Sequence, residues 1–504
     1  MVFNSYIFIL LFLPISLIGY FVLNKYGSKK YGQAGLVWLL GVSLLFYAYD
    51  IPAFLWLFAA SIVVNFLFGK GFMYLKMQKE NTDKLQKVLL TAGILLNLVP
   101  LVYFKYSGFI ADSIEGFFHA EWNVEVPLPL GISFFTFLQI AYLVDCYREE
   151  HGFKDSFLEY ATYVAFFPKI TMGPIVLHSE IVPQLRDGEK RCVNYRNLSC
   201  GLYIFALGLA KKVLIADVLA KFVNIGYADV HGLNSGTFFF VMLSYTLQLY
   251  FDFSGYCDMA VGIAKMFNID LPYNFNSPYK AKSISEFWDR WHITLTRFFT
   301  KYVYIPLGGS RKGKLRTYTN TMIVFLLSGL WHGADWSFVL WGLLHGVLMI
   351  VEKVGKELGF GLKELSRNLQ RIVDVVRWIV TFALINITWV FFRADSVKTA
   401  VYFLQGMDDG GWPLKESMIE VFDKLVEVRI LKRFGMSAVL EANTTLTMWI
   451  ILLVLVMAVV FLKNAKEKMM EEKYNWKRSL VTVILIVWSV ISLSEVSEFL
   501  YFNF

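Results

Sequence analysis

Two histidines in this sequence each follow a tryptophan, at Trp291-His292 and at Trp331-His332. Imidazole is the side chain whose ordinary pKa suits proton transfer near neutral pH, so these residues suggest a general base. Glycines stand three residues before His332 and one residue after it, which leaves room for a substrate or another backbone to approach. The alternative is a histidine that packs between helices, with glycines that allow close contact.

The depth of His332 follows from the charges that precede it. A basic cluster ends at Arg316, and the sixteen residues from there to His332 would extend about 24 Å as a helix. His332 would then lie well inside a bilayer, where a neutral imidazole is tolerated and a permanent charge is much more costly. Both interpretations, a general base and a packing histidine, fit this position.

The segment Pro272–Phe299 carries His292 and a dense set of aromatic and polar residues. Ser283 followed by Glu286 is a capping box, which predicts that a helix begins there. We expect the segment to lie in the membrane interface or to line a re-entrant cavity, although an interfacial histidine satisfied by a neighbour is an alternative for His292. Its aromatic flank and its polar residues are Phe287, Trp288, Trp291, Asp289, Arg290 and His292.

A third polar stretch closes an apolar run with Asp252, Ser254 and Asp258. The two carboxylates are six residues apart, which does not place them on one helix face, and Gly255 between them suggests a break. An ionisable group at membrane depth indicates a functional site, because it needs a partner or a water-filled cavity. The alternative places both aspartates at the interface, where they cap the next helix.

Other reactive patterns are absent from the sequence. It holds no GxSxG elbow, P-loop, GxGxxG turn or HExxH helix, so serine hydrolases, nucleotide-driven pumps and zinc proteases lose their usual support. The four cysteines lack metal-ligand spacing, and we expect neither a metal site nor a disulfide framework. His345 repeats the histidine-glycine pattern, and we expect it to pack against or support the site.

The composition indicates what kind of element positions these residues. Of 504 residues, 57% are hydrophobic and only 17% are charged, which excludes a disordered chain, a soluble enzyme and a collagen-like fibre. Long unbroken apolar runs also argue against an outer-membrane barrel, whose strands alternate. The net charge of +8 lies in short loops that orient helices and meet lipid headgroups, so nucleic acid is not an expected partner. We predict an all-α polytopic membrane protein.

About 11 to 13 windows are long and apolar enough to cross or enter a bilayer core about 30 Å thick. We expect the first window to be a retained span and not a signal peptide. The basic loops at 70–87, 311–316 and 463–478 should face the cytoplasm. The polar region 396–444 is expected to be an extramembrane loop with an amphipathic helix around Lys415–Val428. The windows are 4–23, 35–49, 52–69, 88–105, 127–145, 157–175, 199–217, 236–253, 318–333, 336–351, 376–392, 446–462 and 479–495.

The motifs in this order resemble the membrane-bound O-acyltransferase (MBOAT) family, in its bacterial branch of alginate O-acetyltransferases, with the D-alanyl transferases as relatives. The resemblance spans nearly the whole chain and is carried by residues 129–137, 167–169, 173–175, 250–259, 287–292, 330–333 and the ending 498–504. It implies one membrane domain over 1–504, shaped as a ring of helices around a central funnel. N-terminal helices would occupy 1–125, the core with the catalytic motifs 126–352, and C-terminal helices 353–504.

The resemblance also implies roles and partners. His332 corresponds to the proposed catalytic base and His292 to the second histidine of the site. No cofactor is expected to be bound, and the acyl donor is expected to be acetyl-CoA entering from the cytoplasm. A separate extracytoplasmic esterase-like acetyltransferase of the SGNH type would pass the acyl group to a polysaccharide or peptidoglycan. Residues expected to contact substrate or donor are Trp288, Arg290, Trp291, Trp331, Asp252, Ser254 and Asp258.

The sequence thus predicts a multi-pass O-acetyltransferase of the inner, cytoplasmic membrane. Among enzymes, the alternative is D-alanyl transfer from a carrier protein to teichoic acid. A polysaccharide transporter or flippase would also have broken helices and polar residues at mid-membrane depth, but it would more often show paired interrupted helices. A non-catalytic scaffold for a polysaccharide synthase is a further alternative, and it would tolerate the loss of His332.

Overall fold

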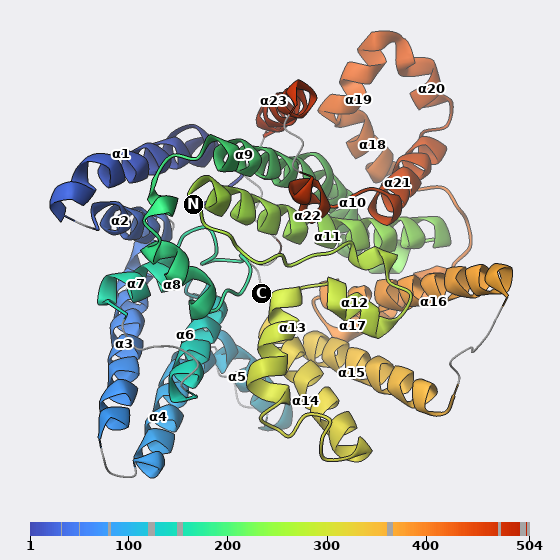
Figure 1. Ribbon diagram of the computed structural model, residues 1–504. Coiled ribbons are helices and arrows are strands. Elements are labelled where there is room, and N and C mark those ends of the chain that lie inside the picture. Colours follow the sequence, from blue (N-terminus) through green and yellow to red (C-terminus); the bar gives the residue numbers. More distant parts are fainter. Residues whose placement is uncertain are drawn as a thin grey trace. The chain divides into compact units, whose positions relative to one another are not determined.

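The computed structural model describes residues 1–31, 33–49, 51–78, 82–118, 126–148, 155–359, 366–471, 475–493 and 500. These residues are mainly helical and contain no β-strand (Figure 1). They form two compact units, each of which is described by itself. The first comprises Met1–Leu209, Tyr256–Tyr273 and Tyr474–Leu485, and the second comprises Ala210–Gly255, Asn274–Lys473 and Ile486–Phe504.

The first unit holds the N-terminal helices, the last part of α11 and most of α23. A buried polar cluster joins three of its helices, since the amide of Asn97 bonds Asn65 at 2.7 Å and the amide of Gln139 bonds Ser61 at 3.1 Å. Its helices are α1 (Leu13–Tyr31), α2 (Ala34–Ala48), α3 (Leu55–Met77), α4 (Asp83–Leu101), α5 (Ser107–Phe118), α6 (Ile132–Tyr147), α7 (Phe157–Ala165), α8 (His178–Arg186), α9 (Tyr195–Ala210) and α23 (Trp476–Ile491).

The second unit carries both candidate histidines. Within it, α15 packs along α14 and α16 packs on α15. Its helices are α10 (Asp217–Ala228), the first part of α11 (Ser235–Met266), α12 (Ile284–Arg290), α13 (Ile293–Phe299), α14 (Lys314–His332), α15 (Trp336–Glu357), α16 (Arg367–Arg393), α17 (Val397–Gln405), α18 (Glu416–Lys424), α19 (Val426–Leu431), α20 (Ser437–Ala442), α21 (Thr444–Phe461) and α22 (Ala465–Met470).

Within the described residues, six helical segments are long and apolar enough to cross a membrane, and two further apolar helices, α2 and α6, are shorter. Their outer faces remain exposed and apolar, as lipid-facing helices require. The polytopic helical class predicted from composition is thereby confirmed. The other windows lie in helices that are shorter or more polar, except that residues 166–175 of the window 157–175 are not helical. The six segments are Phe8–Tyr26, Pro52–Met77, Asp83–Ile114, Trp336–Glu357, Arg367–Arg393 and Thr444–Phe461.

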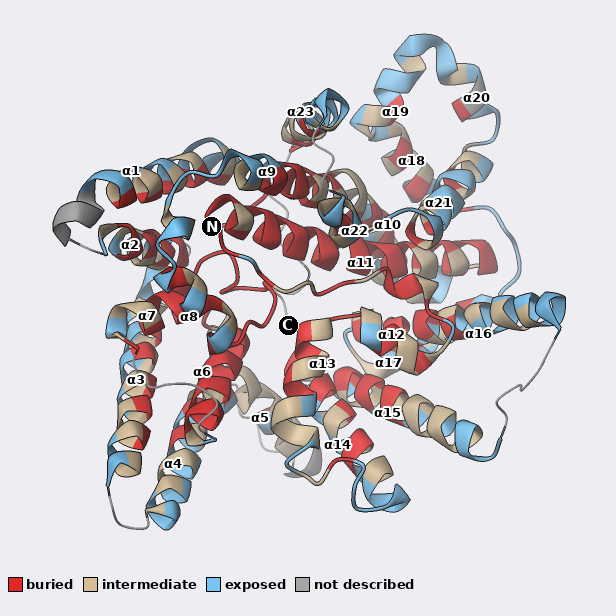
Figure 2. Cartoon of the chain, in the orientation of Figure 1, coloured by how far each residue is buried: buried red, intermediate tan, exposed pale blue. Residues whose placement is uncertain are grey.

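The break expected at Gly255 does not occur. Helix α11 runs without interruption from Ser235 to Met266, and Figure 2 shows it as one of the most buried helices. A mid-helix glycine costs about 1 kcal/mol relative to alanine, which is less than the packing gained by burying the residues around it. The expectation was wrong because tertiary packing outweighed local propensity.

The polar region 396–444 is also more structured than expected. In place of one amphipathic helix around Lys415–Val428, α18 ends at Lys424 and α19 begins at Val426, with extended backbone at Leu425. Phe422 and Val428 are both buried and line the same apolar cavity. They are six residues apart, so a continuous helix would place them on different faces. The break lets both side chains contact that cavity.

Candidate functional site

The backbones of α14 and α15 approach closely, and this approach positions His332. A Cβ atom added to Gly329 would lie 2.3 Å from the carbonyl oxygen of Phe338, and one added to Gly342 would lie 2.4 Å from that of Phe325. Neither clash can be relieved by a side-chain movement, because the obstructing atoms are backbone. Glycine at these two positions therefore brings the C-terminal end of α14, where His332 lies, against the start of α15.

His332 is the last residue of α14, so the segment from the basic loop to this histidine is helical, as predicted. Its side chain is 2% exposed and is surrounded by aromatic rings. The ring centroid of His332 lies 4.9 Å from that of Trp331 and 5.1 Å from those of Trp341 and Phe392. The Trp341 and Phe392 rings meet the imidazole edge to face, which is a favourable arrangement for aromatic pairs. The imidazole is thus confined to one orientation in an environment with little access to water.

His292 reaches the same region from a different element. It is the N-cap of α13 and has the left-handed backbone angles φ 45° and ψ 50°. Its side chain is fully buried, and its Nδ1 lies 3.1 Å from Oδ1 of Asn274. Its ring centroid lies 5.8 Å from Trp331 and 6.3 Å from His332. The structure therefore brings together the two histidines that are forty residues apart in the sequence.

The segment that leads to His292 begins as the capping box predicts. The Ser283 hydroxyl accepts a hydrogen bond from the backbone N–H of Glu286 and caps α12. The Glu286 carboxylate accepts a hydrogen bond from the backbone N–H of Lys282. In a standard capping box the donor would be the N–H of Ser283, one residue later. It also accepts a hydrogen bond at 3.0 Å from the guanidinium of Arg290, which is held on the flank of α12 away from full burial.

Trp288 lies in α12 and Trp291 is the C-cap of that helix, and both line the interior beside the histidines. Trp288 is buried and donates its indole N–H to Nδ1 of His345 at 3.3 Å. The Trp291 ring lies 5.5 Å from Phe287 in a stacked arrangement and 5.0 Å from Trp389. These rings form walls around the site, and His345 supports one of them, as expected for a packing histidine.

Asp252 and Ser254 lie on the part of α11 that belongs to the second unit. A carboxylate oxygen of Asp252 is 2.7 Å from Nζ of Lys212, and the same ammonium is 2.8 Å from Asp217. Lys211 donates a hydrogen bond to the Ser254 hydroxyl at 3.3 Å. Both residues thus have basic partners, and Asp252 and Lys212 also line a cavity, so for Asp252 the functional interpretation of a partnered carboxylate fits better than a helix cap.

Asp258, unlike the other predicted site residues, belongs to the first unit. It is 9% exposed and lies on α11. Among the described residues, no group of three or more histidine, cysteine, aspartate or glutamate side chains is arranged to hold a metal ion.

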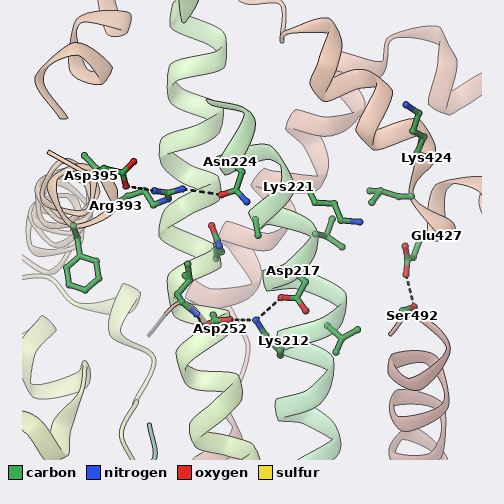
Figure 3. Close-up of a pocket in the computed structure, with 18 of the residues that line it drawn as sticks. Lys212, Asp217, Lys221, Asn224, Asp252, Arg393, Asp395, Lys424, Glu427 and Ser492 are labelled. Atoms are coloured by element: carbon green, nitrogen blue, oxygen red, sulfur yellow. Dashed lines mark hydrogen bonds and ion pairs between the residues drawn. The ribbon is translucent and has the colours of Figure 1, made fainter. Parts of the chain in front are cut away.

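Asp252 lines a large polar cavity of about 800 Å³ in the second unit (Figure 3). Acidic and basic side chains alternate around it, and several are already joined to one another in ion pairs and hydrogen bonds. Phe392 lines the cavity and also contacts His332, so the cavity wall continues into the aromatic surroundings of that histidine. The charged residues in its lining are Lys212, Asp217, Lys221, Asp252, Asp335, Arg393, Asp395, Lys424, Glu427 and Arg429.

A second, smaller cavity of about 240 Å³ lies in the same unit. It is mostly apolar, and residues Thr321, Phe325 and Ser328 of α14 contribute to its lining. The lining of the large cavity includes Asp335, Ser337 and Phe338, which follow His332 closely in the chain. Phe392 of the large cavity contacts His332, and Ser328 of the small cavity lies one turn before His332 on α14.

Sequence reasoning missed several residues that hold the site together. Lys212 carries a charge inside the apolar window 199–217, and the rule that drew attention to Asp252 would have identified it as well. Asn274 lies within the polar segment that contains His292 but has no distinctive spacing from it. Trp341 and Trp389 look like ordinary aromatic residues of apolar spans, and only the folded packing shows their contacts with the site.

Comparison with known proteins identifies the family. Residues 42–392 match the family described as MBOAT, the membrane-bound O-acyltransferase family. The whole chain is 37% identical to a peptidoglycan O-acetyltransferase of Helicobacter pylori, over 98% of that protein. It is 35% identical over 82% of its length to a probable alginate O-acetylase of Pseudomonas aeruginosa, covering 76% of that protein. Similarity to the teichoic acid D-alanyltransferase of Bacillus subtilis is weaker, at 27% identity over 50% of this chain and 65% of that protein.

These matches cover the helices that carry both histidines and the tryptophans around them. The helical fold and the six segments able to span a membrane agree with a protein that is embedded in a membrane by several passes. The chain therefore belongs to the membrane-bound O-acyltransferase family and is a multi-pass membrane acyltransferase.

Proposed function

We propose that this protein moves an acetyl group from cytoplasmic acetyl-CoA to the outer side of the cytoplasmic membrane, for O-acetylation of an extracytoplasmic glycan. Its relatives at 35–37% identity are named for peptidoglycan and for alginate O-acetylation. The peptidoglycan relative is matched over the full length of this chain, so a cell-wall glycan is the favoured final acceptor.

The contact of His332 with Phe392 in the wall of the large cavity, one helical turn from Ser328 in the wall of the small one, is the observation that carries this proposal. The small cavity adjoins the part of α14 that begins next to the basic loop 311–316, which should face the cytoplasm. The large polar cavity adjoins residues beyond His332. An acyl donor in the small cavity and an acceptor in the large one would each lie near this histidine.

The chemistry of each cavity suits one reactant. The small cavity is lined by Trp288 and Phe325, with Lys353 also contributing, and it could accept the uncharged thioester end of the donor. The large cavity offers many hydrogen-bonding groups of both signs, which suits a hydroxyl-bearing acceptor. A separate SGNH-type protein on the outer face would then carry the acetyl group to the polymer.

The reaction has two stages, attack on the thioester and departure of the thiolate, and each includes one proton transfer. His332 accepts the proton of the acceptor hydroxyl as its oxygen attacks the thioester carbon and forms the new C–O bond. The C–S bond then breaks, and the thiolate of CoA takes the proton from the imidazolium. General base catalysis of this kind is worth roughly 10²–10⁴-fold in rate. The aromatic rings around His332 exclude water that would otherwise hydrolyse the thioester.

Acetyl transfer from labelled acetyl-CoA in isolated membranes tests this proposal, with a co-expressed SGNH-type partner. We expect His332→Gln to lower transfer by roughly 10²-fold or more. The matched control is His231→Gln, because His231 is an exposed histidine in a short 3₁₀ helix of the same unit and its replacement should leave transfer unchanged. Equal membrane levels of each variant must be verified by immunoblot.

The other outcomes would reject parts of the proposal. Unchanged transfer by His332→Gln would remove His332 as the base. Transfer only from a D-alanyl carrier protein, and none from acetyl-CoA, would instead favour the activity for which the teichoic acid relatives are named. Movement of a lipid-linked glycan without acyl transfer would indicate a flippase.

A further inference from the structure

The side chain of Asn274 contacts both His292 and Thr294 through a single oxygen. Its Oδ1 lies 2.9 Å from the Thr294 hydroxyl, 3.2 Å from the Thr294 backbone nitrogen and 3.1 Å from Nδ1 of His292. All three residues are buried. This arrangement constrains the protonation of the imidazole, because each contact must pair a donor with an acceptor.

The backbone N–H of Thr294 can only donate, so the Asn274 atom that faces it must be the carbonyl oxygen and not the amide nitrogen. An amide oxygen has no proton to give. The hydrogen bond to His292 therefore requires that Nδ1 of His292 carry the proton. Complete burial disfavours the charged form of the ring, so the second nitrogen, Nε2, is left with a lone pair.

The backbone around this contact is held firmly. The N–H of Ile293 donates to the carbonyl of Asn274 at 3.0 Å, and the N–H of Asn276 donates to the carbonyl of Arg290 at 2.9 Å. These two bonds tie the loop that carries Asn274 to the turn between α12 and α13. The left-handed conformation of His292 lies inside this turn and orients its ring toward Asn274.

The opposite edge of the imidazole points away from Asn274. Within the described part of the chain, Nε2 of His292 is buried and has no hydrogen-bond partner. The His332 ring lies 6.3 Å away between centroids, which is too far for a direct hydrogen bond but allows one hydroxyl oxygen to contact both rings. A buried acceptor without a partner costs free energy, so it indicates a group that binds there.

We propose that Asn274 is a positioning residue that fixes His292 in the tautomer protonated at Nδ1, so that Nε2 accepts a hydrogen bond from the acceptor hydroxyl. The second half of this statement rests on the proposed acyltransfer function, whereas the tautomer does not. Thr294 supports the arrangement by keeping the Asn274 oxygen turned toward His292. In this scheme His292 orients the hydroxyl while His332 removes its proton.

Nitrogen-15 NMR of the histidine rings in the purified full-length protein measures the tautomer directly, without any substrate. Protonated and unprotonated ring nitrogens resonate in well-separated regions. Subtracting the spectrum of His292→Gln assigns the His292 signals, and His292→Asn serves the same purpose, since asparagine tolerates the left-handed conformation. We expect Nδ1 in the protonated region and Nε2 in the unprotonated one.

Variants of Asn274 separate positioning from a purely structural role. Asn274→Leu removes the acceptor at similar volume, and we expect a mixed tautomer signal and a kcat reduced by about tenfold or more with little change in KM. Asn274→Asp retains an acceptor oxygen and should keep the wild-type tautomer. Thr294→Val removes one donor only and should shift the tautomer less than Asn274→Leu does.

A wild-type spectrum with the proton on Nε2 would overturn the proposal, even if acetyl transfer proceeds. A wild-type tautomer retained in Asn274→Leu would also overturn it, because Asn274 would then not control the ring. If acetyl transfer is absent in every protein but the tautomer is as expected, the positioning role stands and the proposed function fails. If Asn274→Leu does not fold, the wild-type spectrum and Thr294→Val still decide.

Discussion

His332 and His292 are held by different means, and this difference bears on what each can do. Aromatic rings confine His332, whereas a polar contact with Asn274 anchors His292. Edge contacts with aromatic rings restrict the orientation of the His332 imidazole. The anchored ring of His292 is better suited to orienting a hydroxyl than to releasing and rebinding a proton.

The backbone of His292 provides a test at this scale. A non-glycine residue in the left-handed region costs about 1–2 kcal/mol, and both alanine and glycine would remove the same side-chain contacts. We therefore expect His292→Gly to be more stable than His292→Ala, by about 1 kcal/mol in thermal unfolding in detergent. At Thr294, inside α13, the order should reverse, since glycine is disfavoured within a helix. Equal stability of the two His292 variants would contradict the strained geometry.

The buried ion pair of Lys212 and Asp252 supplies a second residue-scale prediction. Both side chains are 2% exposed, so Lys212→Met would leave a buried carboxylate without its ammonium partner. We expect a loss of about 3–5 kcal/mol in unfolding free energy, and partial recovery in the double variant Lys212→Met/Asp252→Leu. Chemical unfolding monitored by tryptophan fluorescence would measure both.

The control for this pair is an exposed one in the same unit. Glu420 lies 3.6 Å from Lys424, and both side chains are more than half exposed. Glu420→Gln should therefore change stability by less than about 1 kcal/mol. A similarly small effect of Lys212→Met would mean that Asp252 is hydrated and that its partner contributes little.

At the scale of elements, the close packing of α14 and α15 determines the position of His332. Gly329→Ala and Gly342→Ala would each drive a Cβ atom into a backbone carbonyl oxygen, at 2.3 Å and 2.4 Å. We expect both variants to be destabilised and to lose most acetyl transfer, because His332 would move relative to Trp341. Overpacking of this kind costs about 1–3 kcal/mol or more.

Gly355→Ala is the matched control for these glycines. Gly355 lies on α15 as well, but an added Cβ atom would meet nothing within 4 Å. Alanine there should leave activity unchanged and could raise stability by up to about 1 kcal/mol through helix propensity. Equal losses in all three variants would show that the packing of α14 against α15 is not the cause of the effect.

The elements that sequence reasoning predicted well depend on local signals. Ser283 and Glu286 marked the start of α12, and the apolar run after Arg316 marked a helix that reaches His332. The errors arose where packing decided the outcome, since burial carries α11 through Gly255 and a shared cavity breaks the helix at Leu425. The contact of Asn274 with His292 spans eighteen residues and has no periodic signature, so only the fold reveals it.

At the scale of the whole molecule, the candidate spans of the second unit cross the membrane in alternating directions, and these directions agree with the positions of the basic loops. Helix α14 begins beside the basic loop 311–316, and α21 ends before the basic segment 463–478. Between them, α15 and α16 form a pair that returns the chain to the side on which α14 ends. By the positive-inside rule the large polar cavity, lined by Asp395 and Lys424, should open away from the cytoplasm.

Cysteine labelling in spheroplasts checks this orientation. Ser310 lies beside the basic loop, Lys424 lines the large cavity, and both are exposed. In a Cys192→Ser background, which removes the exposed native thiol, we expect a membrane-impermeant maleimide to label Lys424→Cys in sealed spheroplasts and Ser310→Cys only after lysis. The reverse pattern would place the polar cavity on the cytoplasmic side, and the donor and acceptor assignments of the two cavities would then have to be exchanged.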